Sequence, residues 1–143
     1  MRSFAEQLAE HLIARQAILE RYIDLCPIPC FILNKDGETI FINEAYQQAY
    51  NVRLDQVDKR QWEQLVAPED REKYVAEFDR FIGQRRSSFF TSIRTLTQGV
   101  PVDSIVRVSH VPGNGYIGYI LFQCSNNGQC PVRNVIDNYL SHT

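Results

Sequence analysis

The sequence predicts an α+β fold in which one antiparallel sheet is covered on one face by helices. Apolar and β-branched runs typical of strands gather near residues 30–43 and again over 88–123, with a helical middle between them. Strands grouped on both sides of helices, rather than alternating with them, favour an antiparallel sheet over a parallel one. At 143 residues the chain fits one domain with terminal extensions.

Residues 3–24 are expected to form an amphipathic helix before the first strand. Ser3 followed by Glu6 is a capping-box pattern, in which each side chain accepts a hydrogen bond from the other residue's backbone N–H. Pro27 and Pro29 end the helix. Its apolar stripe can pack on its own domain or against a second copy of the chain, and two heptads do not decide between these. This predicted dimer helix contains Leu8, Leu12, Leu19 and Tyr22.

The first two strands are expected at 30–33 and 38–43, joined as a hairpin because Asp36-Gly37 suits a tight turn. A one-sided helix follows over 44–50, and short helical turns are expected within 54–65.

The longest middle helix is predicted to begin at Ala67-Pro68-Glu69-Asp70, with proline and acidic residues in its first turn. Gly83 is expected just past its end, at the C′ position.

Three more strands are expected over 88–96, 102–110 and 116–123, with a strong hairpin signal at Asn114-Gly115. The predicted domain organisation is then a helix over 1–24, a domain over 25–124, and a tail over 125–143 containing a short helix.

Composition narrows the class of protein. Hydrophobic residues make up 44% of the chain and charged residues 22%, as in ordinary globular proteins. The net charge of −2 is a poor match for nucleic acid, which needs a basic face. No run approaches the roughly 20 apolar residues of a membrane span, and the first residues lack a signal-peptide pattern. We therefore expect a cytoplasmic protein with no membrane or nucleic-acid partner.

The ordered motifs resemble those of the PAS sensor-domain family over about residues 25–124. The segment from Phe31 to Ala45 is similar to the family's strand, turn, strand and Asn-x-Ala helix entry, and Leu65 to Arg71 is similar to the start of its longest helix. The resemblance implies a five-stranded sheet of order 2-1-5-4-3, a pocket between sheet and helices, and a sensory or protein-interaction role in signal transduction.

Two features depart from that family. Gln123-Cys124-Ser125-Asn126 stands where an Asp-x-Thr element often couples the last strand to an effector helix, and no kinase, cyclase, phosphodiesterase or helix-turn-helix pattern follows. Output is therefore expected through a homodimer, a separate effector protein, or an effector in a larger parent chain. The alternative is a structural interaction domain that binds no ligand.

The cofactor is not determined by the sequence. Residues 70–83 lack the histidine that usually binds haem in this family, and the cysteine of photoreactive flavin domains is missing from the middle helices. A small organic ligand is possible, although aromatic residues at such spacing also make an ordinary core. The pocket candidates are Phe31, Leu33, Phe41, Asn43, Tyr46, Tyr50, Trp62, Phe78, Phe90, Val106, Val108 and Ile120.

The four cysteines form two spaced pairs, Cys26 with Cys30 and Cys124 with Cys130. If the first and last strands pair antiparallel, all four thiols approach one end of the sheet, where they could hold a metal or act as a redox switch. The alternative is that they are small buried apolar side chains. No Ser/His/Asp arrangement, phosphate loop or paired carboxylates are evident, so we do not expect an enzyme.

Overall fold

The computed structural model describes residues 3–111 and 115–122, without the side chains of residues 8–9 and 11–13. The predicted order of elements is confirmed over this part of the chain, whereas residues 112–114, the expected C-terminal helix, Cys124 and Cys130 lie outside it. The elements are α1 (Phe4–Asp24), β1 (Cys30–Leu33), β2 (Thr39–Ile42), α2 (Glu44–Tyr50), the 3-10 helices η1 (Leu54–Gln56) and η2 (Gln61–Leu65), α3 (Pro68–Gly83), β3 (Ser88–Thr97), β4 (Val100–Val111) and β5 (Gly115–Phe122).

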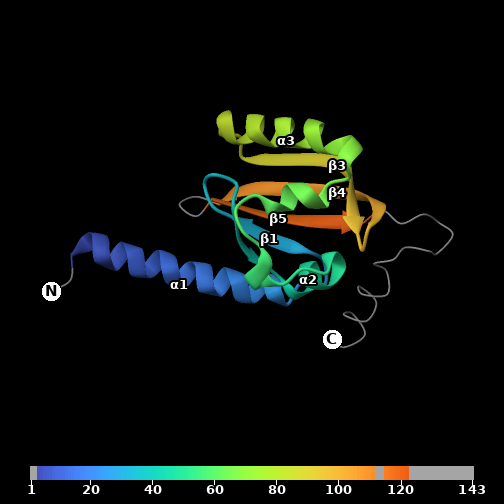
Figure 1. Ribbon diagram of the computed structural model, residues 1–143. Helices are drawn as coiled ribbons and strands as arrows, with labels where there is room; N and C mark the ends of the chain where they lie inside the picture. Colours follow the sequence, from blue (N-terminus) through green and yellow to red (C-terminus); the bar gives the residue numbers. More distant parts are fainter. Residues whose placement is uncertain (1–2, 112–114, 123–143) are drawn as a thin grey trace.

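The five strands form one antiparallel sheet of order β2-β1-β5-β4-β3, as the resemblance implied (Figure 1). The first and last strands are neighbours in its middle, where Ile32 pairs with Ile117 on β5 and with Phe41 on β2. β3 and β4 form a long hairpin whose turn is Gln98-Gly99, both with positive φ angles near those of a type I′ turn.

Local signals in the sequence explain where the helices begin and end. Asn43 caps α2 by accepting a hydrogen bond from the Tyr46 N–H at 3.0 Å, and Asn51 ends it in the left-handed conformation. α3 begins at Pro68 as predicted. The prediction for Gly83 was wrong, because α3 includes Gly83 and the left-handed residue beyond it is Arg85, with a φ of 51°.

Asp70 joins the start of α3 to the edge strand β3. Its Oδ2 accepts hydrogen bonds from the Arg94 backbone N–H at 2.9 Å and from Arg94 Nε at 3.2 Å, while Oδ1 accepts from Nη2. These contacts lower the pKa of Asp70 below its ordinary value. The acidic residue in the helix-start motif therefore fixes α3 over the sheet.

The sheet has apolar side chains on both faces. Its inner face meets α2, η2 and α3 in a large, mostly aromatic cluster. Its outer face meets the end of α1 in a smaller cluster, which contains Ile23, Cys30 and Ile32 at its centre. The prediction that Phe90 faces inward was wrong, because Phe89 is the buried residue and Phe90 is 66% exposed.

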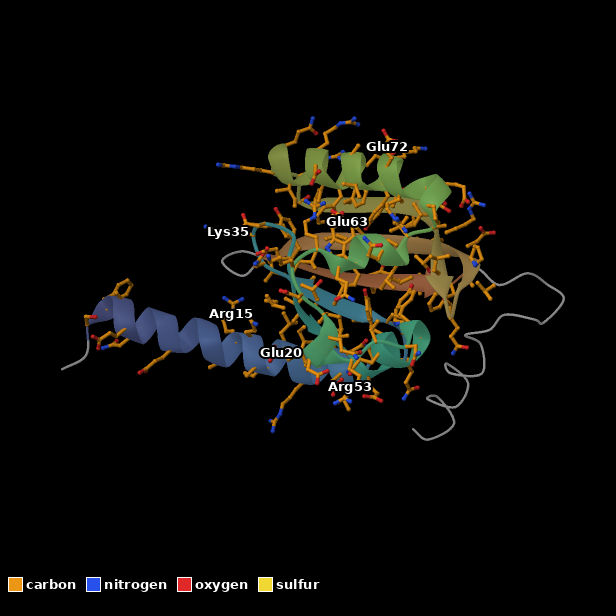
Figure 2. All side chains as sticks on the ribbon, in the orientation of Figure 1. Arg15, Glu20, Lys35, Arg53, Glu63 and Glu72 are labelled. Carbon is orange, nitrogen blue, oxygen red and sulfur yellow. The ribbon has the colours of Figure 1, made fainter. Side chains whose placement is uncertain are left out.

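Among the described side chains of α1, those that pack on the sheet lie near its C-terminal end (Figure 1). Its N-terminal half extends beyond the sheet, and Figure 2 shows side chains there projecting away from the domain. The Ser3 side chain accepts the Glu6 N–H at 3.2 Å, so the predicted N-cap is present. Among the described residues, no helix has the length and apolar character needed to cross a membrane.

Candidate functional site

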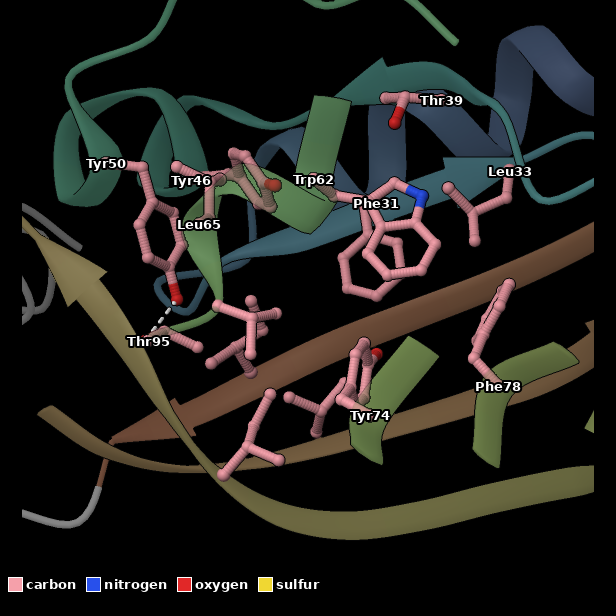
Figure 3. A pocket seen from close by; sticks show the side chains of 14 residues that line it. Phe31, Leu33, Thr39, Tyr46, Tyr50, Trp62, Leu65, Tyr74, Phe78 and Thr95 are labelled. Atoms are coloured by element: carbon pink, nitrogen blue, oxygen red, sulfur yellow. Dashed lines mark hydrogen bonds between the residues drawn. The ribbon is translucent and has the colours of Figure 1, made fainter. Parts of the chain in front are cut away.

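A cavity lies between the inner face of the sheet and the helices that cover it. Figure 3 shows side chains from strands, α2, η2 and α3 pointing into one shared space. Most of them are aromatic or aliphatic, with threonine and tyrosine oxygens among them. The lining residues are Phe31, Leu33, Thr39, Tyr46, Tyr50, Trp62, Leu65, Val66, Tyr74, Phe78, Ile93, Thr95, Val106 and Ile120.

The cavity is small in this conformation. Its volume is about 30 Å³, which is room for one or two water molecules. Sites for drug-sized ligands enclose about 300–1,000 Å³, so a larger guest needs side chains to move.

Two tyrosine hydroxyls, those of Tyr46 and Tyr74, point into this space (Figure 3). Both rings are almost fully buried, and among the described residues neither hydroxyl has a hydrogen-bond partner. Burial raises the pKa of both phenols, so both remain neutral O–H donors around neutral pH. In the described part of the chain, neither hydroxyl oxygen is a fully enclosed atom without a partner, so each one reaches the cavity space. A bound acceptor there would form a hydrogen bond that the protein itself does not supply.

A third tyrosine, Tyr50, is already paired. Its hydroxyl donates to Thr95 Oγ1 at 3.0 Å, and Thr95 Oγ1 lies 2.9 Å from Ser104 Oγ. Ser104 Oγ in turn donates to the Val102 carbonyl at 2.9 Å. This chain of bonds ties the end of α2 to β3 and β4, so Tyr50 acts as a fixed wall of the cavity.

Trp62 on η2 forms the wall between the cavity and solvent. Its indole Nε1 donates to the Gly37 carbonyl at 2.8 Å, and its ring packs edge-on against Phe78 with centroids 4.8 Å apart. Outside it, the Arg60 guanidinium lies 4.9 Å from the Trp62 ring centroid and pairs with Asp79 at 2.7 Å. The Trp62 ring, with the Arg60 guanidinium on its outer side, therefore separates the cavity from solvent.

Most of the pocket residues expected from the sequence line this cavity, and four do not. Phe41 lies in the outer-face cluster, and Val108 is buried in the inner core away from the cavity. Asn43 is fully buried, but its amide binds backbone groups instead of facing the cavity. Phe90 points to the outer face. The candidates that line the cavity are Phe31, Leu33, Tyr46, Tyr50, Trp62, Phe78, Val106 and Ile120, and their role as ligand contacts stays a prediction.

Sequence reasoning missed several lining residues, including Tyr74, Ile93 and Thr95. Tyr74 precedes Phe78 by one helical turn, so helical spacing alone could have found it. Ile93 and Thr95 lie on the same face of β3 as Phe89. The prediction that Phe90 faces inward assigned Ile93 and Thr95 to the outer face, so they were not among the candidates.

Of the four cysteines in the predicted site, Cys26 and Cys30 lie in the described part of the chain, and the prediction of a site that joins all four stays untested. Cys26 and Cys30 come together in the outer-face cluster, with Cys30 buried and Cys26 half-buried. Within the described part of the chain, no group of three or more His, Cys, Asp or Glu side chains could hold a metal ion. Of the predicted dimer-helix residues, Leu19 packs on its own sheet and Tyr22 is 72% exposed, while the Leu8 and Leu12 side chains are outside the description.

Comparison with known proteins agrees with this architecture. Residues 23–122 match the family described as PAS fold. No curated protein matches the sequence.

Among solved structures, a PAS domain of a Colwellia psychrerythraea protein is 17% identical, covers 78% of this chain and 97% of its own, and has a TM-score of 0.63. The PAS domain of Bordetella pertussis BvgS is 16% identical over 90% and 99% of the two chains, with a TM-score of 0.60. The PAS domain of the Cronobacter turicensis quorum-sensing receptor RpfR, solved in complex with C12:0, is 14% identical over 69% and 96%, also with a TM-score of 0.60.

Proposed function

Because the chain belongs to the PAS fold family, we propose that it is a sensory module whose inner cavity binds a small, mostly apolar ligand with a hydrogen-bond acceptor. The observation that carries this proposal is the pair of tyrosine hydroxyls, of Tyr46 and Tyr74, aimed into a mostly apolar space. A carbonyl or carboxyl group would accept from both, while the aromatic walls would enclose the rest of the molecule.

Expansion of the cavity is expected on the side of η2. The opposite wall is a hydrogen-bonded sheet, whereas η2 is a single short 3-10 helix. Outward movement of Trp62 and Leu65 would enlarge the space without breaking strand pairing. This movement would convert ligand binding into a shift between two packings of the helical layer on the sheet.

Trp62 is the single tryptophan of the chain and lines the cavity, so its fluorescence reports directly on occupancy. We expect dodecanoic acid, chosen because the Cronobacter domain was solved with C12:0, to change this fluorescence saturably. Mass spectrometry under native conditions would also show any small molecule that purifies with the protein.

Three matched Tyr→Phe variants locate the contact. Tyr46→Phe and Tyr74→Phe keep the ring and remove the donor, so each should raise the dissociation constant about tenfold, equivalent to about 1.4 kcal/mol. Tyr119→Phe on the outer face is the control and should leave it unchanged. Equal affinities in all three variants, or neither a fluorescence response nor a co-purified molecule in the wild type, would contradict the proposal.

We also propose that the module transmits its signal without catalysis, through a homodimer or an effector reached by α1. The supporting observation is a stripe of exposed apolar residues along one side of that helix and its C-cap. Ile18 and Tyr22 on α1 are 54% and 72% exposed, and Leu25, the C-cap residue, is 74% exposed. Their spacing of four and three residues places them on one face, where a second copy of the helix can pack.

Mass in solution tests self-association. Ile18→Glu together with Tyr22→Glu should give monomers, because two charges would be buried in the helix contact. Ala17→Glu adds a charge about a quarter turn away on the same exposed helix and should leave the dimer intact. A wild-type protein that is monomeric at high concentration would contradict the homodimer, and the exposed face of α1 would then be assigned to an effector protein.

A further inference from the structure

Cys26 and Cys30 lie at the junction where α1 turns into β1. α1 ends at Asp24, Cys30 is the first residue of β1, and Pro27-Ile28-Pro29 connects the two cysteines. Both side chains belong to the outer-face cluster, where Cys26 packs against the buried group that contains Cys30. The Cys26 thiol is near enough to contribute to the raised pKa of Cys30. The two thiols are therefore neighbours across a very short loop.

The backbone around both thiols is held by one buried side chain. Asn43 Nδ2 donates to the Ile23 carbonyl at 2.7 Å and to the Ile28 carbonyl at 2.9 Å, and its Oδ1 accepts the Cys30 N–H at 2.9 Å. The two prolines further limit the loop between the cysteines. Because the thiols are positioned before any reaction, joining them costs little conformational entropy.

The two thiols differ in environment. Cys26 is half-buried, whereas Cys30 is 6% exposed, and burial together with the Cys26 thiol raises the pKa of Cys30. A partly exposed cysteine that meets oxidant first, beside a more buried cysteine that can resolve it, is the arrangement of a reversible thiol switch.

We propose that Cys26 and Cys30 are a redox-responsive pair that a peroxide oxidises to an intramolecular disulfide. The Cys26 thiolate attacks the peroxide O–O bond, takes one oxygen to become a sulfenic acid, and releases water or an alcohol. The Cys30 sulfur then attacks the Cys26 sulfur, forming the S–S bond as the S–O bond breaks, and the leaving hydroxide takes up the Cys30 proton as water. Two thiols and one peroxide give one disulfide, one water and one water or alcohol.

This inference does not rest on the ligand cavity, which lies on the opposite face of the sheet. The chain has four cysteines, so Cys124→Ser with Cys130→Ser leaves only the pair in question. Wild type and this double variant are reduced, treated with hydrogen peroxide, alkylated and digested with trypsin. Cleavage after Arg21 and Lys35 places both cysteines in the peptide Tyr22–Lys35.

In both proteins that peptide should lose two hydrogens in mass and both alkylation sites, and dithiothreitol should restore them. A disulfide that maps instead to Cys124 or Cys130, or thiols that stay alkylatable at peroxide levels that oxidise free cysteine, would overturn the proposal.

The order of the two steps is tested by trapping the sulfenic acid with dimedone. Cys30→Ala removes the resolving thiol while keeping the buried position apolar, so it should accumulate dimedone on Cys26, with little labelling in wild type. Cys26→Ser should protect Cys30 from oxidation because Cys30 is buried. Thermal unfolding of each variant checks that it is folded. Equal dimedone labelling of Cys26 in wild type and Cys30→Ala would overturn the resolving role of Cys30.

Discussion

The two faces of the sheet are packed by different means. The inner face is covered by three helical segments, and its aromatic rings contact one another in a continuous cluster around Phe78. The outer face is covered near β1 by the end of a single helix, in a cluster whose buried centre is aliphatic and cysteine side chains, with only Phe41 and Tyr119 as partly buried aromatic residues among those described. Many side chains therefore share the packing of the inner core, whereas the packing of the outer face depends on a few residues at the junction of α1 and β1.

Asn43 is the residue on which both regions depend. It holds the end of α1 through backbone carbonyls, and it caps α2, which carries Tyr46 and Tyr50 into the cavity. A buried amide with this many partners is a specific structural device, because each bond fixes a backbone group that water cannot reach.

Asn43→Ala should have one of the two largest effects on stability. It leaves the buried N–H groups of Cys30 and Tyr46 without acceptors, at about 1–3 kcal/mol each, so we expect a loss of about 3 kcal/mol or more in the free energy of unfolding. Urea unfolding measures this loss. Asn43→Asp keeps the acceptor but places a carboxylate beside the carbonyls of Ile23 and Ile28, so its stability should rise as the pH falls. A loss below 1 kcal/mol for Asn43→Ala would contradict this account.

Phe78→Ala tests the inner core against the outer surface of the same sheet. Phe78 is 1% exposed and lies among five other aromatic rings, so its truncation should cost about 3–5 kcal/mol. Phe90→Ala removes the same ring from a 66% exposed position and should change stability by less than about 0.5 kcal/mol. Similar losses in the free energy of unfolding of the two variants would mean that Phe90, and not Phe89, faces the inner core.

That pair of phenylalanines shows where sequence reasoning ended. Turn residues and helix caps act locally, so the hairpin around Gly37 and the start of α3 were predictable. The strand order came from the resemblance to the PAS family and not from any local signal. Phe89 and Phe90 are adjacent and equally apolar, and a one-residue error in parity exchanges the two faces of a strand. Only the pairing with β4 decides between them, and that is a tertiary fact.

The cavity was predictable to a similar degree. Aromatic residues on α2, η2 and α3 marked its walls, but its small volume depends on how the rings pack, which no spacing records. Asn43 looked like a polar handle for a ligand because its sequence neighbours line the cavity. Its partners are backbone carbonyls twenty and fifteen residues earlier in the chain, which a local pattern does not reveal.

Asp70→Asn should have an intermediate effect, because it weakens the link between α3 and β3. Loss of the charged fork to Arg94 should cost about 1 kcal/mol at neutral pH. The folded-state pKa of Asp70 lies below its ordinary value of 3.8, so the wild type keeps this stability above pH 3.8 and loses it as the pH falls through the lower value. Urea unfolding from neutral pH to about pH 3 should show wild type approaching the variant. A constant difference over that range would exclude Asp70 as its source.

The smallest effect is expected for Tyr22→Ala on α1. Tyr22 lies in the last turn of α1, next to the buried Ile23, yet 72% of it is exposed. It therefore contributes almost nothing to the packing of α1 on its own sheet. Alanine also favours helix slightly more than tyrosine does. Unfolding at a protein concentration low enough to give monomers should therefore differ from wild type by no more than about 0.5 kcal/mol. A loss above 1 kcal/mol would show that Tyr22 packs within its own chain. If the Tyr22→Ala monomer has wild-type stability at low concentration, and the variant also fails to dimerise at high concentration, the exposed face of α1 is assigned to association. The Tyr22 ring would then matter only between molecules.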